Sequence, residues 1–235
     1  MDKKKAIRII TSAAKLYHTN LEDQKVCFVY GIPGEIKKRL LEGNKALTGL
    51  SYYEAAFLRS NFLHLTGVKL KKEGQIKSSI EFYERCLANR LSENDFELSK
   101  DGSTDQKLDV LEQMMNIKKN VQMIGEFTDL GIKLYSEKVA GNTCACIGFV
   151  TDNRNGLNVP NTLLKKDIRD VSSKPQKKVY VVFSKPYQNE KYSVQEKCDK
   201  CITVDGHILP KEIMELLEEH LCRTATSRSL VLMMN

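Results

Sequence analysis

Residues 121–150, VQMIGEFTDLGIKLYSEKVAGNTCACIGFV, decide the fold class of this chain. Two strand-like segments, 121–127 and 132–138, lie on either side of the turn-forming sequence TDLG. A third, 144–150, follows a hairpin signal at residues 140–142. Because short turns join strands that run in opposite directions, the stretch predicts consecutive strands of an antiparallel sheet.

The rest of the chain adds helices before this sheet and a strand after it. Residues 6–21 form an amphipathic pattern with an apolar stripe, and a short buried strand follows at 26–30. Further predicted elements are a surface turn or short helix at 35–41, a strand in preference to a helix at 52–59, a short basic helix at 163–171 and a strand at 178–184. This order predicts an α+β fold and not a doubly wound parallel sheet.

Two helices are predicted from capping boxes. Residues 78–81, SSIE, begin a helix that runs to about residue 91, with four side chains directed inward, Ile80, Tyr83, Leu87 and Leu91. Residues 103–106, STDQ, begin a second helix that ends near residue 115. Its predicted core residues are Leu108, Leu111, Met114 and Met115.

The composition changes after Pro186, and we expect residues 1–190 to form one domain and 191–235 a small C-terminal helical appendage. The appendage contains a predicted helix at 210–221 and the pair Cys198 and Cys201. Zinc would need further ligands, from His207, His220 and Cys222, and two ordinary thiols are the preferred interpretation. We therefore expect neither a metal nor another cofactor.

The overall composition is that of an ordinary globular protein, with 235 residues and a net charge of +7. No apolar run approaches the roughly 18 residues of a membrane span, and no signal-peptide core follows the basic start. Seven irregularly spaced cysteines do not suggest a disulfide framework, so a cytoplasmic protein with no membrane partner is expected. Residues 162–191 carry eight basic and three acidic side chains, an excess that favours phosphate-bearing partners but is also common on solvated surfaces.

The side chains available for chemistry suit cleavage of RNA without a metal. The common phosphate-binding, metalloprotease and hydrolase motifs are absent. What remains is a histidine, two hydroxyls and several cations, namely His64, Thr66, Thr162, Lys165, Lys133 and Lys138. Such groups can remove one proton, donate another and stabilise charge on phosphate. The plainer alternatives are a half-buried structural histidine and lysines on a solvated face.

Four segments in this order resemble the phage and mobile-element group of barnase–EndoU–colicin–RelE-like (BECR) nucleases. They are 61–68 (NFLHLTGV), 134–142 (LYSEKVAGN), 145–150 (ACIGFV) and 159–170 (VPNTLLKKDIRD), and the resemblance covers about residues 6–190. It implies N-terminal helices packed on a curved antiparallel sheet and metal-independent ribonuclease chemistry. It also implies an RNA substrate, often tRNA, and a role as a toxin or counter-defence effector of a phage or conjugative element.

On this basis we predict roles for individual residues. His64 is the general acid or base, Thr66 a hydrogen-bond donor to phosphate, and Lys165 with Thr162 the charge and hydroxyl partners across the cleft. The RNA backbone would be held by Lys133, Lys138, Arg169 and Lys185. The alternative is a catalytically silent module of the same fold that binds nucleic acid or a host protein. An immunity protein or a host protein is a further expected partner.

Overall fold

The computed structural model describes residues 1–42, 47–128, 136–202 and 209–222. Its helices are α1 (Lys3–Asn20), α2 (Pro33–Leu41), the 3-10 helix η1 (Arg59–Asn61), α3 (Phe62–Thr66), α4 (Ser79–Leu87), α5 (Ser103–Met114), α6 (Ile117–Asn120), α7 (Ile168–Val171), α8 (Lys211–Met214) and α9 (Glu219–Cys222). Its strands are β1 (Gln24–Gly31), β2 (Ser51–Phe57), β3 (Lys69–Leu70), β4 (Phe96–Glu97), β5 (Met123–Glu126), β6 (Lys138–Gly141), β7 (Cys146–Asp152), β8 (Leu157–Leu164), β9 (Lys177–Pro186) and β10 (Val194–Cys198).

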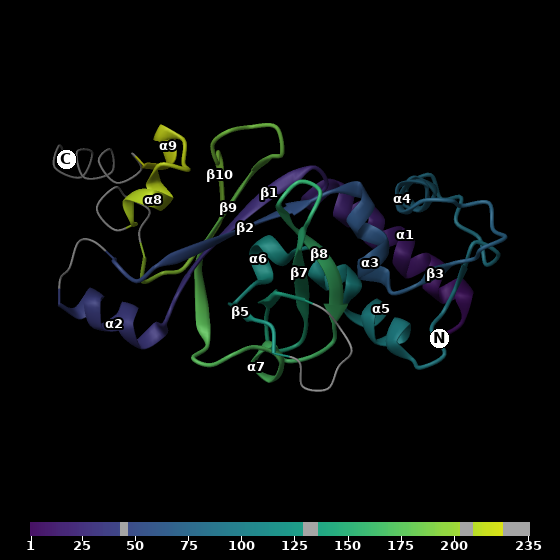
Figure 1. Cartoon of the computed structure of the whole chain (residues 1–235), viewed down its shortest axis with the longest axis horizontal. Coiled ribbons are helices and arrows are strands. Elements are labelled where there is room, and N and C mark those ends of the chain that lie inside the picture. Colours follow the sequence, from purple (N-terminus) through teal and green to yellow (C-terminus); the bar gives the residue numbers. More distant parts are fainter. Residues whose placement is uncertain (43–46, 129–135, 203–208, 223–235) are drawn as a thin grey trace, which may run out of the picture.

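Eight of the strands form one antiparallel sheet, in the order β2-β1-β9-β5-β6-β7-β8, with β10 also paired to β9. The sheet curves so far that its end strands β8 and β2 meet, and the Asn158 side-chain amide donates to the Glu54 carbonyl oxygen at 2.9 Å. Figure 1 shows α1, α3, α4 and α5 gathered at the end of the molecule that carries the N-terminus. The predicted α+β fold, with N-terminal helices on a curved antiparallel sheet, is therefore confirmed.

The main core lies between the sheet and the N-terminal helices. Tyr17 of α1 is fully buried and contacts the rings of Phe57, Phe62 and Tyr83 edge-on, at centroid distances of 5.4 to 6.4 Å. Its hydroxyl donates to the Leu58 carbonyl oxygen at 2.8 Å, so no polar group is left unpaired in this aromatic cluster. The packing fixes the chain on either side of η1 and α3, which follow directly after β2.

The C-terminal segment packs on the opposite face of β1 and β9. Cys27 and Val29 of β1 share a second core there with Tyr192, Ile213 and Leu217. The predicted helix at 210–221 is in fact two short helices, α8 and α9, separated by a turn. The division of the chain at residue 190 stays a prediction, because it concerns which part can fold alone.

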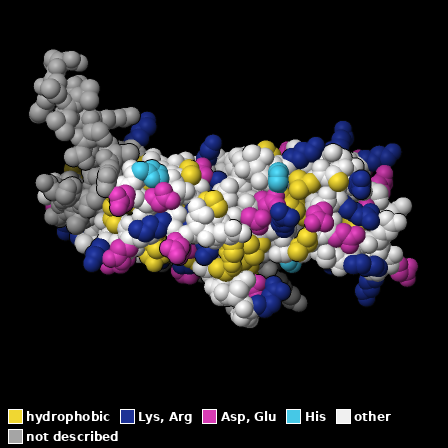
Figure 2. Space-filling view, turned by 90° about the horizontal axis from the view of Figure 1, so that it is seen from above, with side chains coloured by type: hydrophobic (Ala, Val, Ile, Leu, Met, Phe, Trp, Pro, Cys, Tyr) yellow, Lys and Arg dark blue, Asp and Glu magenta, His cyan; other side chains and the backbone are white. Residues whose placement is uncertain are grey.

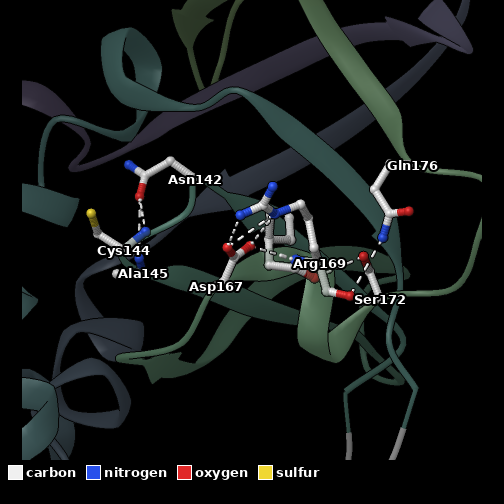
Figure 3. A network of polar contacts seen from close by, with 8 residues as sticks. Asn142, Cys144, Ala145, Asp167, Arg169, Ser172 and Gln176 are labelled. Carbon is white, nitrogen blue, oxygen red and sulfur yellow. Dashed lines mark hydrogen bonds and ion pairs between the residues drawn. The ribbon is translucent and has the colours of Figure 1, made fainter.

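The end of β6 differs from the prediction, because local patterns could not show the pairing partners. The hairpin signalled at 140–142 is present between β6 and β7, but its turn comes later, since β6 continues to Gly141 and the Asn142 N–H donates to the Ala145 carbonyl at 2.9 Å. Figure 3 shows the Asn142 side chain accepting from Cys144 and Ala145 in this turn. The strand predicted at 132–138 lies mostly outside the described residues.

The helix predicted at 163–171 is also wrong, because its first residues belong to β8. Leu163 and Leu164 face opposite sides of the sheet, and each side chain enters a different hydrophobic core. A strand buried on both faces has a continuous apolar run, which periodicity cannot distinguish from a helix. Only Ile168–Val171 is helical.

The capping predictions are correct for one helix only. Ser78 caps α4 by accepting from the Glu81 N–H at 3.1 Å, whereas α5 begins after Gly102 without a side-chain cap. The inward direction of Ile80 is wrong, since its side chain is 46% exposed while Phe82 and Cys86 are buried. The predicted core of α5 is confirmed. Within the described residues, no helix has the length and apolarity needed to cross a membrane.

Candidate functional site

His64 lies on the exposed face of the short helix α3. Phe62 and Leu65 anchor this helix by full burial, and the chain leaves it through Gly67, which has a left-handed φ of +73°. Thr66 is also fully buried, and its hydroxyl donates to the Leu63 carbonyl at 2.7 Å. The predicted contact of Thr66 with phosphate stays a prediction, and in this structure its hydroxyl stabilises the end of α3.

His64 lines a cleft of about 590 Å³. One wall comes from η1, α3 and the first turn of α4, and the other comes from the β7–β8 hairpin. The lining residues are Ser60, Asn61, His64, Ser79, Ile80, Val150, Thr151, Asp152, Asn153, Arg154, Val159, Pro160 and Asn161. Ligand sites in proteins typically have volumes of about 300–1,000 Å³, so the cleft can hold a ligand the size of a nucleotide.

Lys107 of α5 lies next to Gly67 at the end of α3, outside the set of residues that line the cleft. Its ammonium donates to the Thr162 hydroxyl at 3.0 Å, and Thr162 is 1% exposed. The aliphatic part of Lys107 passes over Gly67 so closely that a Cβ there would lie 2.6 Å from Lys107 Cδ. Glycine is therefore favoured at position 67 for two reasons: it adopts the left-handed backbone conformation without strain, and it leaves room for the Lys107 side chain.

Both His64 and Lys107 have lowered pKa values. Burial lowers the pKa of His64 from its usual 6.5, and the positive charge of Lys107 lowers it further. Burial also lowers the pKa of Lys107, although Asp101 acts in the opposite direction. An imidazole that stays neutral beside a cation is suited to accept a proton, and a partly desolvated ammonium is suited to donate one.

The other predicted cations have partners within the protein. Lys165 pairs with Asp109 at 2.9 Å on the exposed surface. The Arg169 guanidinium forms a two-pronged contact with Asp167, which also caps α7 (Figure 3). On the face seen in Figure 2, Lys and Arg side chains alternate with Asp and Glu instead of forming one basic patch.

Three further predicted RNA contacts have different surroundings. Lys185 is 6% exposed, lies over the Tyr192 ring and donates to the Glu190 carbonyl at 2.5 Å. Lys138 pairs with Glu126 at 2.8 Å and lies over the Tyr53 ring. Lys133 lies outside the described residues. The structure thus joins Thr162 to Lys107, whose charge also acts on His64, whereas Lys165, Lys138, Arg169 and Lys185 each have separate surroundings.

Lys107 was not identified from the sequence, although a signal was available. It lies three residues after Thr104 and four before Leu111, both of which are buried, so it borders the inward stripe of α5. A lysine at such a position has its stem against the core and its ammonium at the edge. Its pairing with Thr162, 55 residues later, depends on the tertiary fold.

A second polar cluster, around Glu22, was also not predicted from the sequence. The buried Glu22 carboxylate accepts from the Tyr83 hydroxyl at 2.9 Å, pairs with Arg59 at 2.5 Å and contacts His18. Burial opposes ionisation of Glu22, but hydrogen bonds from His18 and Tyr83 outweigh it and lower its pKa. These contacts tie the end of α1 to η1 and α4, and we interpret the cluster as structural.

Within the described residues, Cys198 and Cys201 are not surrounded by a set of metal ligands. Among the residues that the structure describes, no three His, Cys, Asp or Glu side chains come together as a metal site. Cys198 and Cys201 are free thiols, and Cys201 donates to the Asp199 carboxylate at 2.9 Å. His207, a ligand considered for zinc, lies outside the described residues.

Comparison with known proteins gives one family. The model of the phage-Barnase-EndoU-ColicinE5/D-RelE like nuclease4 family matches residues 9–200. No match was obtained among curated proteins or solved structures.

Proposed function

Since the chain belongs to the phage-Barnase-EndoU-ColicinE5/D-RelE like nuclease4 family, we propose that it is a metal-independent endoribonuclease. Its reaction would be attack of a ribose 2′-hydroxyl on the adjacent phosphate, and its site the cleft that contains His64. The observation that carries this assignment is that Lys107, which is hydrogen-bonded to Thr162, is close enough for its charge to act on His64, an exposed histidine at a polar cleft.

In the proposed reaction, neutral His64 accepts the proton of the 2′-hydroxyl. The 2′ oxygen then forms a bond to phosphorus, and the bond from phosphorus to the 5′ oxygen breaks. Lys107, oriented by the Thr162 hydroxyl, stabilises negative charge on the phosphate and gives a proton to the 5′ oxygen. The products are a 2′,3′-cyclic phosphate and a free 5′-hydroxyl.

Three of the remaining predicted residues, Lys165, Lys138 and Arg169, have supporting roles in this proposal. Lys165 would add positive charge at the rim, where it now pairs with Asp109. Lys138 and Arg169 would contact the RNA backbone by exchanging their carboxylate partners for phosphate. We further propose that the protein is a toxin or counter-defence effector of a phage or conjugative element, with tRNA as a substrate and an immunity or host protein as a partner.

The test uses purified protein, total tRNA and a single-stranded RNA oligonucleotide in the presence of EDTA. Wild-type protein should yield discrete fragments with cyclic phosphate ends, and His64→Ala should yield none. His220→Ala is the matched control, because His220 is an exposed histidine in α9, far from α3 (Figure 1), and its Nε2 donates to the Ser193 carbonyl. An oligonucleotide with 2′-deoxyribose at the cut position should resist cleavage.

Cleavage by His64→Ala at the wild-type rate would refute the assignment of His64. Cleavage of the 2′-deoxy oligonucleotide would refute the proposed attack by the 2′-hydroxyl. Tight RNA binding by a wild-type protein that cuts none of these RNAs would instead favour the catalytically silent module.

A further inference from the structure

Ile80 is an apolar side chain directed into the His64 cleft. It belongs to the first turn of α4, where Phe82, Tyr83 and Cys86 take the buried positions and leave Ile80 46% exposed. Two serines of the same cleft wall, Ser60 and Ser79, are polar and uncharged. The α4 side of the cleft therefore offers an apolar contact surface within a polar rim.

Arg154 faces the cleft from the β7–β8 hairpin. Its Nε and Nη2 donate to the two carboxylate oxygens of Asp152 at 3.0 and 2.9 Å, and its backbone N–H donates to Asp152 Oδ1 at 3.0 Å. The two guanidinium bonds orient the plane of that group and the backbone bond holds the carboxylate, while the Arg154 side chain remains 87% exposed. A planar, weakly hydrated cation held in this way is suited to stack on a flat aromatic ligand.

Asn161 provides an amide at the same cleft. Thr162 pairs with Gly148 and Pro160 with Phe149, so Asn161 is the extra residue of a β-bulge in β8. A bulge redirects a side chain relative to the regular strand, and here the residue lines the cleft. A side-chain amide carries both donors and an acceptor, which matches the edge of a nucleobase.

We propose that this cleft binds one unpaired nucleobase, with its two faces against Ile80 and the Arg154 guanidinium and its edge toward the Asn161 amide. The inference rests on the proposed function, and it specifies single-stranded RNA as the substrate class. A base within a duplex has its faces stacked and its pairing edge occupied, whereas a base in a loop can turn outward. The cleaved phosphate would then lie next to a loop nucleotide.

The experiment measures base stacking directly, without cleavage. A single-stranded RNA with one 2-aminopurine is titrated with the His64→Ala protein, and the fluorescence quench reports stacking of that base. Adding Arg154→Lys should weaken binding roughly tenfold and reduce the quench, since lysine keeps the charge but lacks the plane. Ile80→Asp should have a similar effect, because it places a charge against the base.

Two exposed positions away from the cleft lining give matched controls. Arg90→Lys makes the same change at an exposed arginine, and Val194→Asp replaces a side chain that is 47% exposed, nearly the value of Ile80. Both should bind and quench like His64→Ala alone. Duplex RNA of the same sequence should compete poorly.

Equal binding by the Arg154→Lys and Arg90→Lys proteins would overturn the inference, as would effective competition by duplex RNA. The two proposals fail separately. RNA cleavage that is unaffected by changes at Ile80 and Arg154 would leave the nuclease and refute the base pocket. Base stacking by a protein that cleaves no RNA would leave the pocket and refute the nuclease.

Discussion

Replacing Lys118 with methionine tests whether the C-terminal segment is part of the main fold. Lys118 of α6 pairs with Glu196 of β10 at 2.5 Å, and their side chains are only 10% and 13% exposed. The Ser184 hydroxyl also donates to Glu196 at 2.7 Å, and Lys118 donates to Gln24 at 2.8 Å. Four elements, α6, β1, β9 and β10, thus meet at one buried ion pair.

The expected loss in the free energy of unfolding is about 3 kcal/mol at pH 7. Removing one partner of a buried ion pair costs about 3–5 kcal/mol, since the other charge is left without compensation. We expect the lower value because Glu196 keeps the hydrogen bond from Ser184. For a chain of this size, this corresponds to a fall in melting temperature of about 6–12 °C. The double variant Lys118→Met/Glu196→Leu removes both charges and should regain most of the loss.

The pH dependence identifies the cause of the loss. In the wild-type protein burial alone would raise the pKa of Glu196, but hydrogen bonds from Lys118 and Ser184 outweigh it and hold that pKa below 4.5. Its ionised form therefore stabilises the fold above about pH 4.5, and this contribution is lost as the pH falls through the lowered pKa. Without Lys118 the pKa of Glu196 rises, and protonation relieves the uncompensated charge. The destabilisation should consequently shrink between pH 7 and pH 4.

Urea denaturation followed by circular dichroism at both pH values measures this difference. Lys211→Met is the matched control, because Lys211 pairs with Glu215 at 3.6 Å on the surface, with 86% and 64% exposure. It should cost less than about 1 kcal/mol. If Lys118→Met lost no more stability than Lys211→Met, or if its loss did not change with pH, burial of the Lys118–Glu196 pair would not be the cause of the loss.

Three further predictions concern the cleft. Lys107→Met should lower kcat/KM for RNA about 100-fold, the usual effect of removing one preorganised donor, while exposed Lys100→Met changes it less than about threefold. Gly67→Ala should lower the free energy of unfolding by about 1–2 kcal/mol because of its positive φ, and it should also slow cleavage by displacing Lys107. Gly102→Ala has similar backbone strain but open space around it, so melting curves should show a loss of stability and rate measurements no loss of cleavage. The acidic limb of the pH–rate profile should lie below pH 6.5, because burial and then the charge of Lys107 lower the pKa of His64. Lys107→Met should move this limb and the NMR titration of His64 to higher pH. An unchanged limb would contradict the proximity of Lys107 to His64.

The fold was largely predictable because its elements carry local signals. The stripe of α1 and the short apolar runs of β1 and β9 are signals carried by neighbouring residues, and these elements and β2 occur where they were expected. The errors occur where both sides of an element are covered, as at Leu163 and Leu164, or where an inward position turned out to face the cleft, as at Ile80. In both cases the deciding contact comes from a distant part of the chain.

The candidate site was predictable only in part for the same reason. The segment around His64 has a distinctive local sequence, whereas Lys107 is one lysine among many until Thr162 lies beside it. The bulge at Asn161 likewise depends on the register between β7 and β8. A single sequence indicates which residues can do chemistry, and the fold determines which of them meet.

The contacts in the structure change the interpretation of the basic segment at residues 162–191. The excess of positive charge at residues 162–191 suggested attraction for phosphate, yet Lys165, Arg169 and Lys178 are each paired with a carboxylate and Lys185 is buried. Phosphate would have to displace those carboxylates before it could bind. Selection of a substrate is then better served by the cleft, where Arg154 and Ile80 can contact a base, than by a general basic surface. RNA binding that depends on stacking should fall only gently with salt, since few counterions are released.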